Sequence, residues 1–83
     1  MKSIYINLGE INELQENIMK VMMEWAHTKK TPVPLKSVMN TMEKQGVKRP
    51  TIINSIHGLL VKGYIRKAYI VSNKTYFVLL RSV

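Results

Sequence analysis

The residues with the most distinctive chemistry are basic and polar side chains in the second half of the chain. Residues 48–57 read KRPTIINSIH, in which cations and hydrogen-bonding groups are interleaved with apolar positions. Lysine and arginine bind phosphate, and an asparagine amide matches the edge of adenine. These residue types in this order favour binding to a polyanion.

The same chain offers little for catalysis or metal binding. It has no cysteine, and its two histidines, His27 and His57, lie far apart in the sequence. A zinc site needs about four ligands of this kind, and a nucleophile needs a base beside it. The sequence also lacks a glycine-rich phosphate loop. We therefore expect no enzyme activity, no metal, no cofactor and no evident small-molecule effector.

Charge is divided unevenly along the chain, whose net charge is +8. Residues 1–24 hold two lysines against four glutamates, whereas residues 25–83 hold eleven basic residues against one glutamate, Glu43. This asymmetry predicts that the C-terminal two thirds faces a polyanion while the first helix faces away. A generally basic surface that only aids solubility is the alternative.

Length and hydropathy indicate one small domain over residues 1–83. Its hydrophobic content of 46% suits a folded globule. No run approaches the ~20 apolar residues of a membrane span, and the first residues lack the apolar core of a secretory signal. We expect a cytoplasmic, nucleoid-associated protein that has no membrane partner.

Hydrophobic periodicity predicts three helices. They are expected at about residues 8–27, 34–45 and 50–62. Asn7 is the expected N-cap of the first helix, with Glu10 completing a capping box. The third helix begins with a proline in its first turn and ends before a glycine, as helices often do.

Extended segments are expected at both ends of the chain and near its middle. Residues 65–71 and 75–80 flank a polar tip at residues 72–74 and read as a hairpin. Residues 3–6 read as a short N-terminal strand, and another short strand is expected around Val33. The second hairpin strand, TYFVLL, is apolar on both faces, so the N-terminal strand or a second subunit should cover it.

This order of elements resembles the winged helix-turn-helix families. Residues 56–65, IHGLLVKGYI, resemble the end of the recognition helix in multiple-antibiotic-resistance-type regulators and in the DNA-binding domain of the SOS repressor. Residues 33–52 resemble their second helix, turn and start of the third. The resemblance covers about residues 10–81 and implies an α+β winged helix fold. In that fold the third helix enters the major groove of duplex DNA, and the hairpin is the wing.

Two features depart from those families. Val33 and Pro34 stand where a small or hydroxylated residue usually opens the second helix. Those families also often carry an effector or oligomerisation domain, for which we expect no room in this chain. Small-molecule sensing is therefore not expected.

Helical geometry predicts which side chains of the third helix face DNA. With Ile52, Ile56 and Leu59 in the core, Asn54 and Gly58 point outward. Asn54 is the candidate for reading adenine, and a solvated amide is the alternative. A plain surface role is the alternative for His57, and Ser55 could instead bond its own helix. The full set of expected DNA-binding residues is Lys36, Lys48, Arg49, Thr51, Asn54, Ser55, His57, Arg66, Lys67, Asn73 and Lys74.

The cations before the third helix have a special position. Lys48 and Arg49 oppose the helix dipole, which suggests that an anion completes a phosphate site there. A solvated turn is the alternative.

The first helix carries more apolar residues than one buried seam needs. Met19, Met23 and Ala26 widen its apolar stripe and are the expected contacts of a homodimer, with cover for the N-terminal strand or wing as the alternative. Together these features predict a dimeric, sequence-specific binder of double-stranded DNA, a transcriptional regulator that occludes promoters. A partition or replication adaptor of a plasmid or virus, or a winged helix that binds protein or RNA, are the alternatives.

Overall fold

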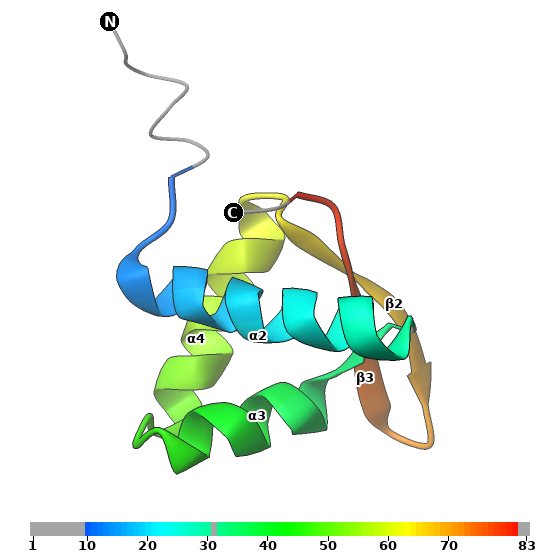
Figure 1. Cartoon of the computed structure of the whole chain (residues 1–83), viewed down its shortest axis with the longest axis horizontal. Coiled ribbons are helices and arrows are strands. Elements are labelled where there is room, and N and C mark those ends of the chain that lie inside the picture. Colours follow the sequence, from blue (N-terminus) through cyan, green and yellow to red (C-terminus); the bar gives the residue numbers. More distant parts are fainter. Residues whose placement is uncertain (1–9, 31, 82–83) are drawn as a thin grey trace, which may run out of the picture.

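The computed structural model describes residues 10–30 and 32–81, which form three helices and one antiparallel sheet of three strands (Figure 1). The described residues therefore make a small α+β unit, as expected from the sequence. The strand expected at residues 3–6 lies outside the described residues. The elements, in chain order, are α2 (Glu13–Lys29), β1 (Val33–Pro34), α3 (Leu35–Lys44), α4 (Arg49–Val61), β2 (Ile65–Val71) and β3 (Lys74–Leu79).

The start of the first helix differs from the prediction. Residues 10–12 are not helical, and Asn12 is the N-cap of α2. Its side chain accepts a hydrogen bond from the backbone N–H of Gln15 at 2.8 Å, and Gln15 Oε1 accepts one from the backbone N–H of Asn12 at 3.1 Å. This reciprocal pair replaces the predicted box, because Glu10 lies before the helix and Asn7 lies outside the described residues.

The sheet places β3 between the other two strands, in the order β1-β3-β2. Phe77 of β3 is paired with Val33 of β1 and with Lys67 of β2. The hairpin is closed by Ser72 and Asn73, whose φ angles of 51° and 64° are those of a tight two-residue turn. Lys74, which was predicted to belong to the tip, therefore opens β3.

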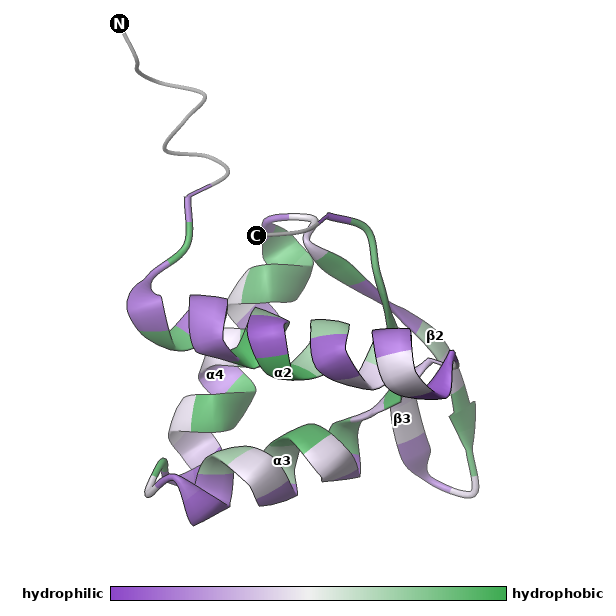
Figure 2. Cartoon of the chain, in the orientation of Figure 1, coloured by the Kyte–Doolittle hydropathy of each residue, from purple (hydrophilic) through white to green (hydrophobic). Residues whose placement is uncertain are grey.

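The core lies between the helices and the sheet. Figure 2 shows hydrophilic and hydrophobic residues alternating along α2, as expected for an amphipathic helix. Met19 is 0% exposed, so its predicted place in a dimer interface is wrong: it is part of the core of its own chain. The buried apolar residues are Ile18, Met19, Met22, Val33, Val38, Met39, Met42, Ile52, Ile56, Leu59, Ile65 and Phe77. No helix among the described residues is long and apolar enough to cross a bilayer.

A polar contact joins α2 to α4 through Gln15. Its side chain is buried, and Nε2 donates a hydrogen bond to the backbone oxygen of Ser55 at 3.3 Å. A Cβ added to Gly58 would overlap that same Nε2 atom. Gly58 therefore faces α2 rather than solvent, and it leaves the space that the buried amide fills. Ser55 is also buried, so its predicted role in contacting DNA is wrong.

Gly58→Ala is expected to lower the free energy of unfolding by about 1 kcal/mol. Alanine normally favours a helix over glycine by about 1 kcal/mol, but here the methyl group displaces Gln15 and costs about 1–3 kcal/mol in lost buried hydrogen bonds. The sign should reverse in a Gln15→Ala background, where Gly58→Ala stabilises. Urea unfolding of the four variants of this cycle measures the reversal. If Gly58→Ala stabilises the protein in both backgrounds, the close contact between Gly58 and the Gln15 side chain is not present.

Candidate nucleic-acid interface

A groove of about 660 Å³ lies between the helices and the tip of the hairpin. The hairpin runs from the end of α4 past the start of α3, which brings β3 beside α3 (Figure 1). Three cations from three different elements line the groove: Lys36 from α3, Arg49 from α4 and Lys74 from β3. No carboxylate is among the described residues that line it. The surface is therefore suited to hold an extended anion.

A smaller hollow of about 240 Å³ continues this surface along α4. His57 and Lys67 line it, and it shares Leu35, Ile53 and Thr75 with the groove. The two hollows therefore form one continuous surface between α4 and the hairpin, which we call the basic groove.

One face of α4 provides a wall of the basic groove. Arg49, Ile53 and His57 are each four residues apart, so they lie in a line along the helix. Ile53 is 52% exposed, an unusual position for a branched apolar side chain between two basic ones. An exposed apolar group in such a place is able to contact the methyl group of thymine.

The electrostatics at the start of α4 are less one-sided than the sequence suggests. Lys48 is the N-cap and makes no side-chain capping bond, and the first turn contains no acidic residue. Arg49 Nε, however, pairs with Glu43 Oε2 at 3.2 Å. The carboxylate of Glu43 thus supplies one anion at the start of α4. Both side chains are partly exposed, so the pair is weak and leaves Arg49 able to exchange partners.

The start of α3 adds a second helix N-terminus to the groove. Pro34 is its N-cap, with no side-chain capping bond and no acidic residue in the first turn. Lys36 and Ser37 of this first turn line the groove. The partial positive charge of the helix end therefore has the same sign as the lysine beside it.

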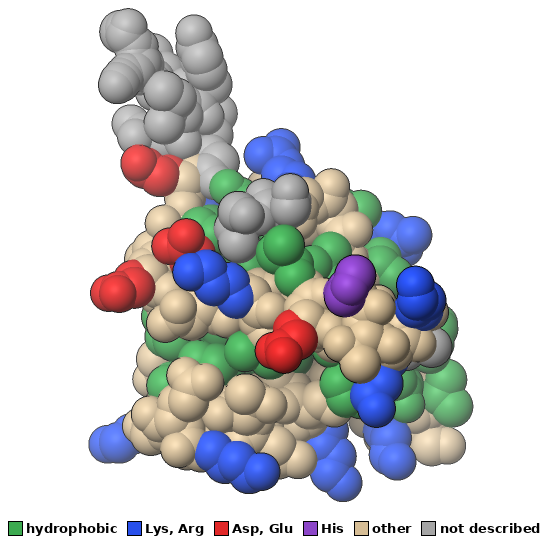
Figure 3. Space-filling model, in the orientation of Figure 1, with side chains coloured by type: hydrophobic (Ala, Val, Ile, Leu, Met, Phe, Trp, Pro, Cys, Tyr) green, Lys and Arg blue, Asp and Glu red, His purple; other side chains and the backbone are tan. Residues whose placement is uncertain are grey.

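Acidic and basic side chains are unevenly distributed on the face that Figure 3 shows. Acidic side chains lie over α2 and the segment before it, with a basic side chain among them, while lysine and arginine side chains gather along the lower edge under α3 and near the hairpin. On this face the contrast predicted from the sequence, between a more acidic first helix and a basic remainder, is visible.

The structure brings together most of the predicted DNA-binding residues. Lys48, Thr51, Asn54 and Arg66 are exposed but do not line the basic groove, and Asn54 lies on the outer ridge of α4. Those that line it are Lys36, Arg49, His57, Lys67, Asn73 and Lys74.

Other residues of the groove were missed from the sequence. Ile53 and Tyr76 both line it, as do Asn40 and Ser37 of α3. The spacing of Ile53 from Arg49 and His57 was the available signal, but an isoleucine next to the core residue Ile52 was not considered as a surface group. Tyr76 also lies against Tyr69, with ring centroids 4.8 Å apart.

The exposed apolar residues differ from those expected to form a dimer contact. Met23 and Ala26 are half-buried. On the edge strand β2, in contrast, Tyr69, Ile70 and Val71 are 46%, 61% and 52% exposed. Within the run TYFVLL, residues 75–79 are partly or fully buried, whereas Leu80 is 54% exposed.

Comparison with other proteins gives no family for this chain: no protein-family model, no curated protein and no solved structure matches it. Among the described residues, no group of three or more histidines and carboxylates is placed to hold a metal ion. What the basic groove offers chemically is electrostatic attraction, hydrogen bonding and apolar contact.

Proposed function

We propose that this chain binds double-stranded DNA in the manner of a winged helix. In this proposal α4 enters the major groove and the β2–β3 hairpin is the wing, which contacts the neighbouring backbone. The helix order and the β1-β3-β2 sheet are compatible with that layout. The observation that carries the proposal is the basic groove, where Lys36, Arg49 and Lys74 converge from three elements.

The proposal assigns different tasks to different parts of the surface. The cations of the groove hold phosphates, which supplies affinity without sequence information. Asn54, which is exposed outside the basic groove, and Ile53, which is exposed on the groove wall, contact base edges. This division makes the chain a sequence-specific binder, and occlusion of a promoter is the simplest regulatory use of it.

We also propose that two copies bind together. The exposed apolar side chains of β2, Tyr69, Ile70 and Val71, leave a patch that a second copy would bury. Two-fold pairing would place two α4 helices about one DNA turn, ~34 Å, apart on one side of the duplex. The expected target is then a pseudo-palindrome.

Selection of bound duplexes from a random pool, repeated over a series of salt concentrations, tests the proposal. We expect an enriched motif. We also expect the logarithm of the binding constant to fall by about 0.9 per phosphate contact for each tenfold rise in salt concentration. If no motif is enriched among the bound duplexes and the affinity depends steeply on salt, the result would favour an architectural DNA binder. Equal binding of duplex and unrelated polyanions would overturn the proposal.

Asn54→Ala is expected to cost roughly 1–3 kcal/mol on the best duplex and little on random duplexes. The reason is that a bidentate asparagine–adenine pair discriminates between bases, whereas phosphate contacts do not. Competition between selected and random duplexes measures the difference. Equal losses of specific and non-specific affinity would show that Asn54 does not read a base.

A further inference from the structure

Two tyrosines of the hairpin form an exposed aromatic pair. Tyr69 of β2 is paired with Tyr76 of β3, and their ring centroids are 4.8 Å apart with 38° between the ring planes. Tyr69 is 46% exposed on β2, which is an outer strand of the described sheet (Figure 1). No neighbouring strand of that sheet covers the side of its ring that faces away from Tyr76. We call the two residues the tyrosine platform.

A β-bulge in β2 places the platform on the outer face of the sheet. Lys67 is paired with Phe77, whereas the next pair along the ladder is Tyr69 with Tyr76, so Ala68 is the extra residue. Paired residues share a face of the sheet, and successive residues of a strand alternate between its faces. Phe77 is part of the buried core. The two tyrosines therefore lie on the face that is directed away from the helices.

Cations lie on both sides of the platform. Arg66 is exposed, and its partner Val78 shares a face of β3 with Tyr76. On the other side, the exposed Lys74 is paired with Val71. The hairpin sequence contains no acidic residue. Proteins that bind single-stranded nucleic acids commonly combine these features, because cations attract the phosphates while bases stack on aromatic rings.

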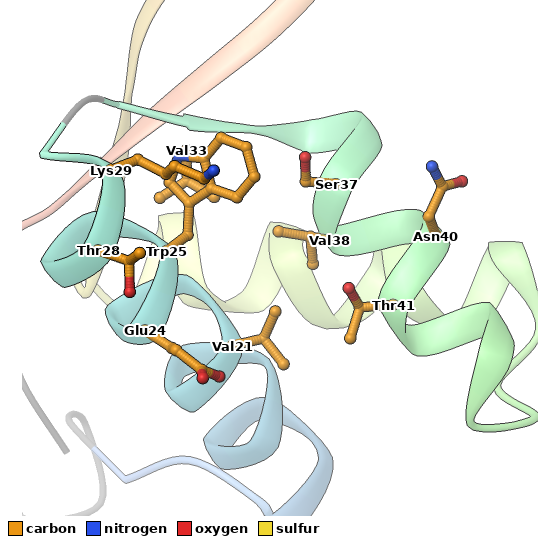
Figure 4. A pocket seen from close by; sticks show the side chains of 10 residues that line it. All are labelled: Val21, Glu24, Trp25, Thr28, Lys29, Val33, Ser37, Val38, Asn40 and Thr41. Carbon is orange, nitrogen blue, oxygen red and sulfur yellow. The ribbon is translucent and has the colours of Figure 1, made fainter.

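The tryptophan of the chain is less open than the platform. Trp25 lines a hollow of about 390 Å³ between α2 and α3, where its ring lies beside Val33 (Figure 4). Its Nε1 atom is buried, and Lys29 Nζ lies 5.5 Å from the ring centroid. Part of the indole is thus covered by its own chain. Trp25 is therefore a suitable reporter of folding, and the hairpin offers the more accessible aromatic surface.

From these features we infer that the tyrosine platform binds unpaired bases of a single-stranded nucleic acid. A base stacks on the open side of Tyr69, and Arg66 and Lys74 hold phosphates on either side of it. The inference does not depend on the proposed duplex binding, because Tyr69 and Arg66 do not line the basic groove. Tyr76 and Lys74 do line that groove, so a strand on the platform leads directly to it.

A second copy of the chain is the competing occupant of this surface. Tyr69 and Val71 belong to the apolar patch of β2 that the proposed second copy would bury. A strand stacked on Tyr69 and a second copy that covers Tyr69 exclude each other. The substitutions that test the inference therefore keep an apolar side chain at position 69.

Fluorescence anisotropy with a short labelled oligo-dT at low salt tests the inference on the wild type. An abasic strand of the same length carries the same phosphates, so a difference between the two strands comes from the bases. We expect oligo-dT to bind at least about tenfold more tightly than the abasic strand, which is the gain typical of base stacking on an aromatic side chain. Equal affinities for the two strands would overturn the inference.

Substitutions at Tyr69 identify the ring that stacks. Tyr69→Leu removes the ring, and should lower the affinity for oligo-dT about tenfold while leaving that for the abasic strand unchanged. Tyr69→Phe keeps the ring and should bind as the wild type does, and so should Val71→Ala, the matched control in the same patch. Trp25 emission during melting checks that each variant is folded. An unchanged affinity for oligo-dT in folded Tyr69→Leu would overturn the inference.

Two further ligands define what the platform recognises. A blunt duplex presents paired bases, so its affinity should not change in Tyr69→Leu; a loss equal to that for oligo-dT would show that the ring does not select unpaired bases. An oligo-U strand of the same length offers the same kind of base on an RNA backbone. Tighter binding of one of the two single strands identifies DNA or RNA as the source of the base.

Discussion

Combining Lys36→Glu with Lys74→Glu is expected to weaken duplex binding by about 100-fold at low salt. These lysines reach the basic groove from α3 and β3, and neither forms an ion pair among the described residues. Each substitution removes an attraction for phosphate and adds a repulsion, and like charges brought together at an interface are costly. The slope of the logarithm of the binding constant against the logarithm of salt concentration should also become shallower, by the amount that corresponds to about two lost phosphate contacts.

The matched control is Lys20→Glu combined with Lys44→Glu. It changes the net charge by the same amount, but Lys20 on α2 and Lys44 at the end of α3 do not line the groove. Fluorescence anisotropy with one labelled duplex over several salt concentrations compares the two. If both pairs weaken binding equally, the net charge of the chain matters and the basic groove does not.

The ends of α4 were predictable because local residues determine them. Pro50 lies in the first turn, and Gly63 adopts a φ of 80° just after the helix, a conformation that glycine reaches without strain. α4 spans Arg49–Val61, so each of its two ends lies within one residue of the predicted range of 50–62. The hairpin was also predictable, since Ser72 and Asn73 separate two runs rich in β-branched and aromatic residues.

The start of α2 was not predictable, because two neighbouring stretches carry the same local signal. Asn7 with Glu10 and Asn12 with Gln15 both have the spacing of a capping box. The pair used in the structure includes Gln15, which also bonds the backbone oxygen of Ser55, 40 residues away. A tertiary contact accompanies the second box, and no local pattern contains that information.

The sequence also did not predict which residues that border the apolar face of a helix are buried. Met19 was assigned to a dimer because one seam needs fewer apolar residues than α2 has. The helix in fact packs against α3, α4 and β1, so its buried stripe is wide. The same limit applies to Gly58 and Ser55: helical angles show that they share a side of α4, but not that α2 covers it.

Phe77→Ala is expected to cost about 3–5 kcal/mol, the largest stability loss of the variants considered. Phe77 is 2% exposed in the central strand, and pairs across both neighbouring strands. Phe77 also lines the hollow along α4. Removing a buried phenyl ring leaves a cavity as well as losing its transfer free energy. A small domain has only about 5–15 kcal/mol of stability to lose.

Val61 offers a control for this substitution, because it is 73% exposed at the end of α4 and lies outside the apolar patch of β2. Val61→Ala should change the unfolding free energy by less than about 0.5 kcal/mol, because an exposed side chain loses few contacts. Urea unfolding compares the two variants. Phe77 also anchors the hairpin that carries Lys74, so duplex affinity should fall with the folded fraction at each urea concentration. A Phe77→Ala midpoint equal to that of Val61→Ala would show that the hairpin is not held to the helices through this ring.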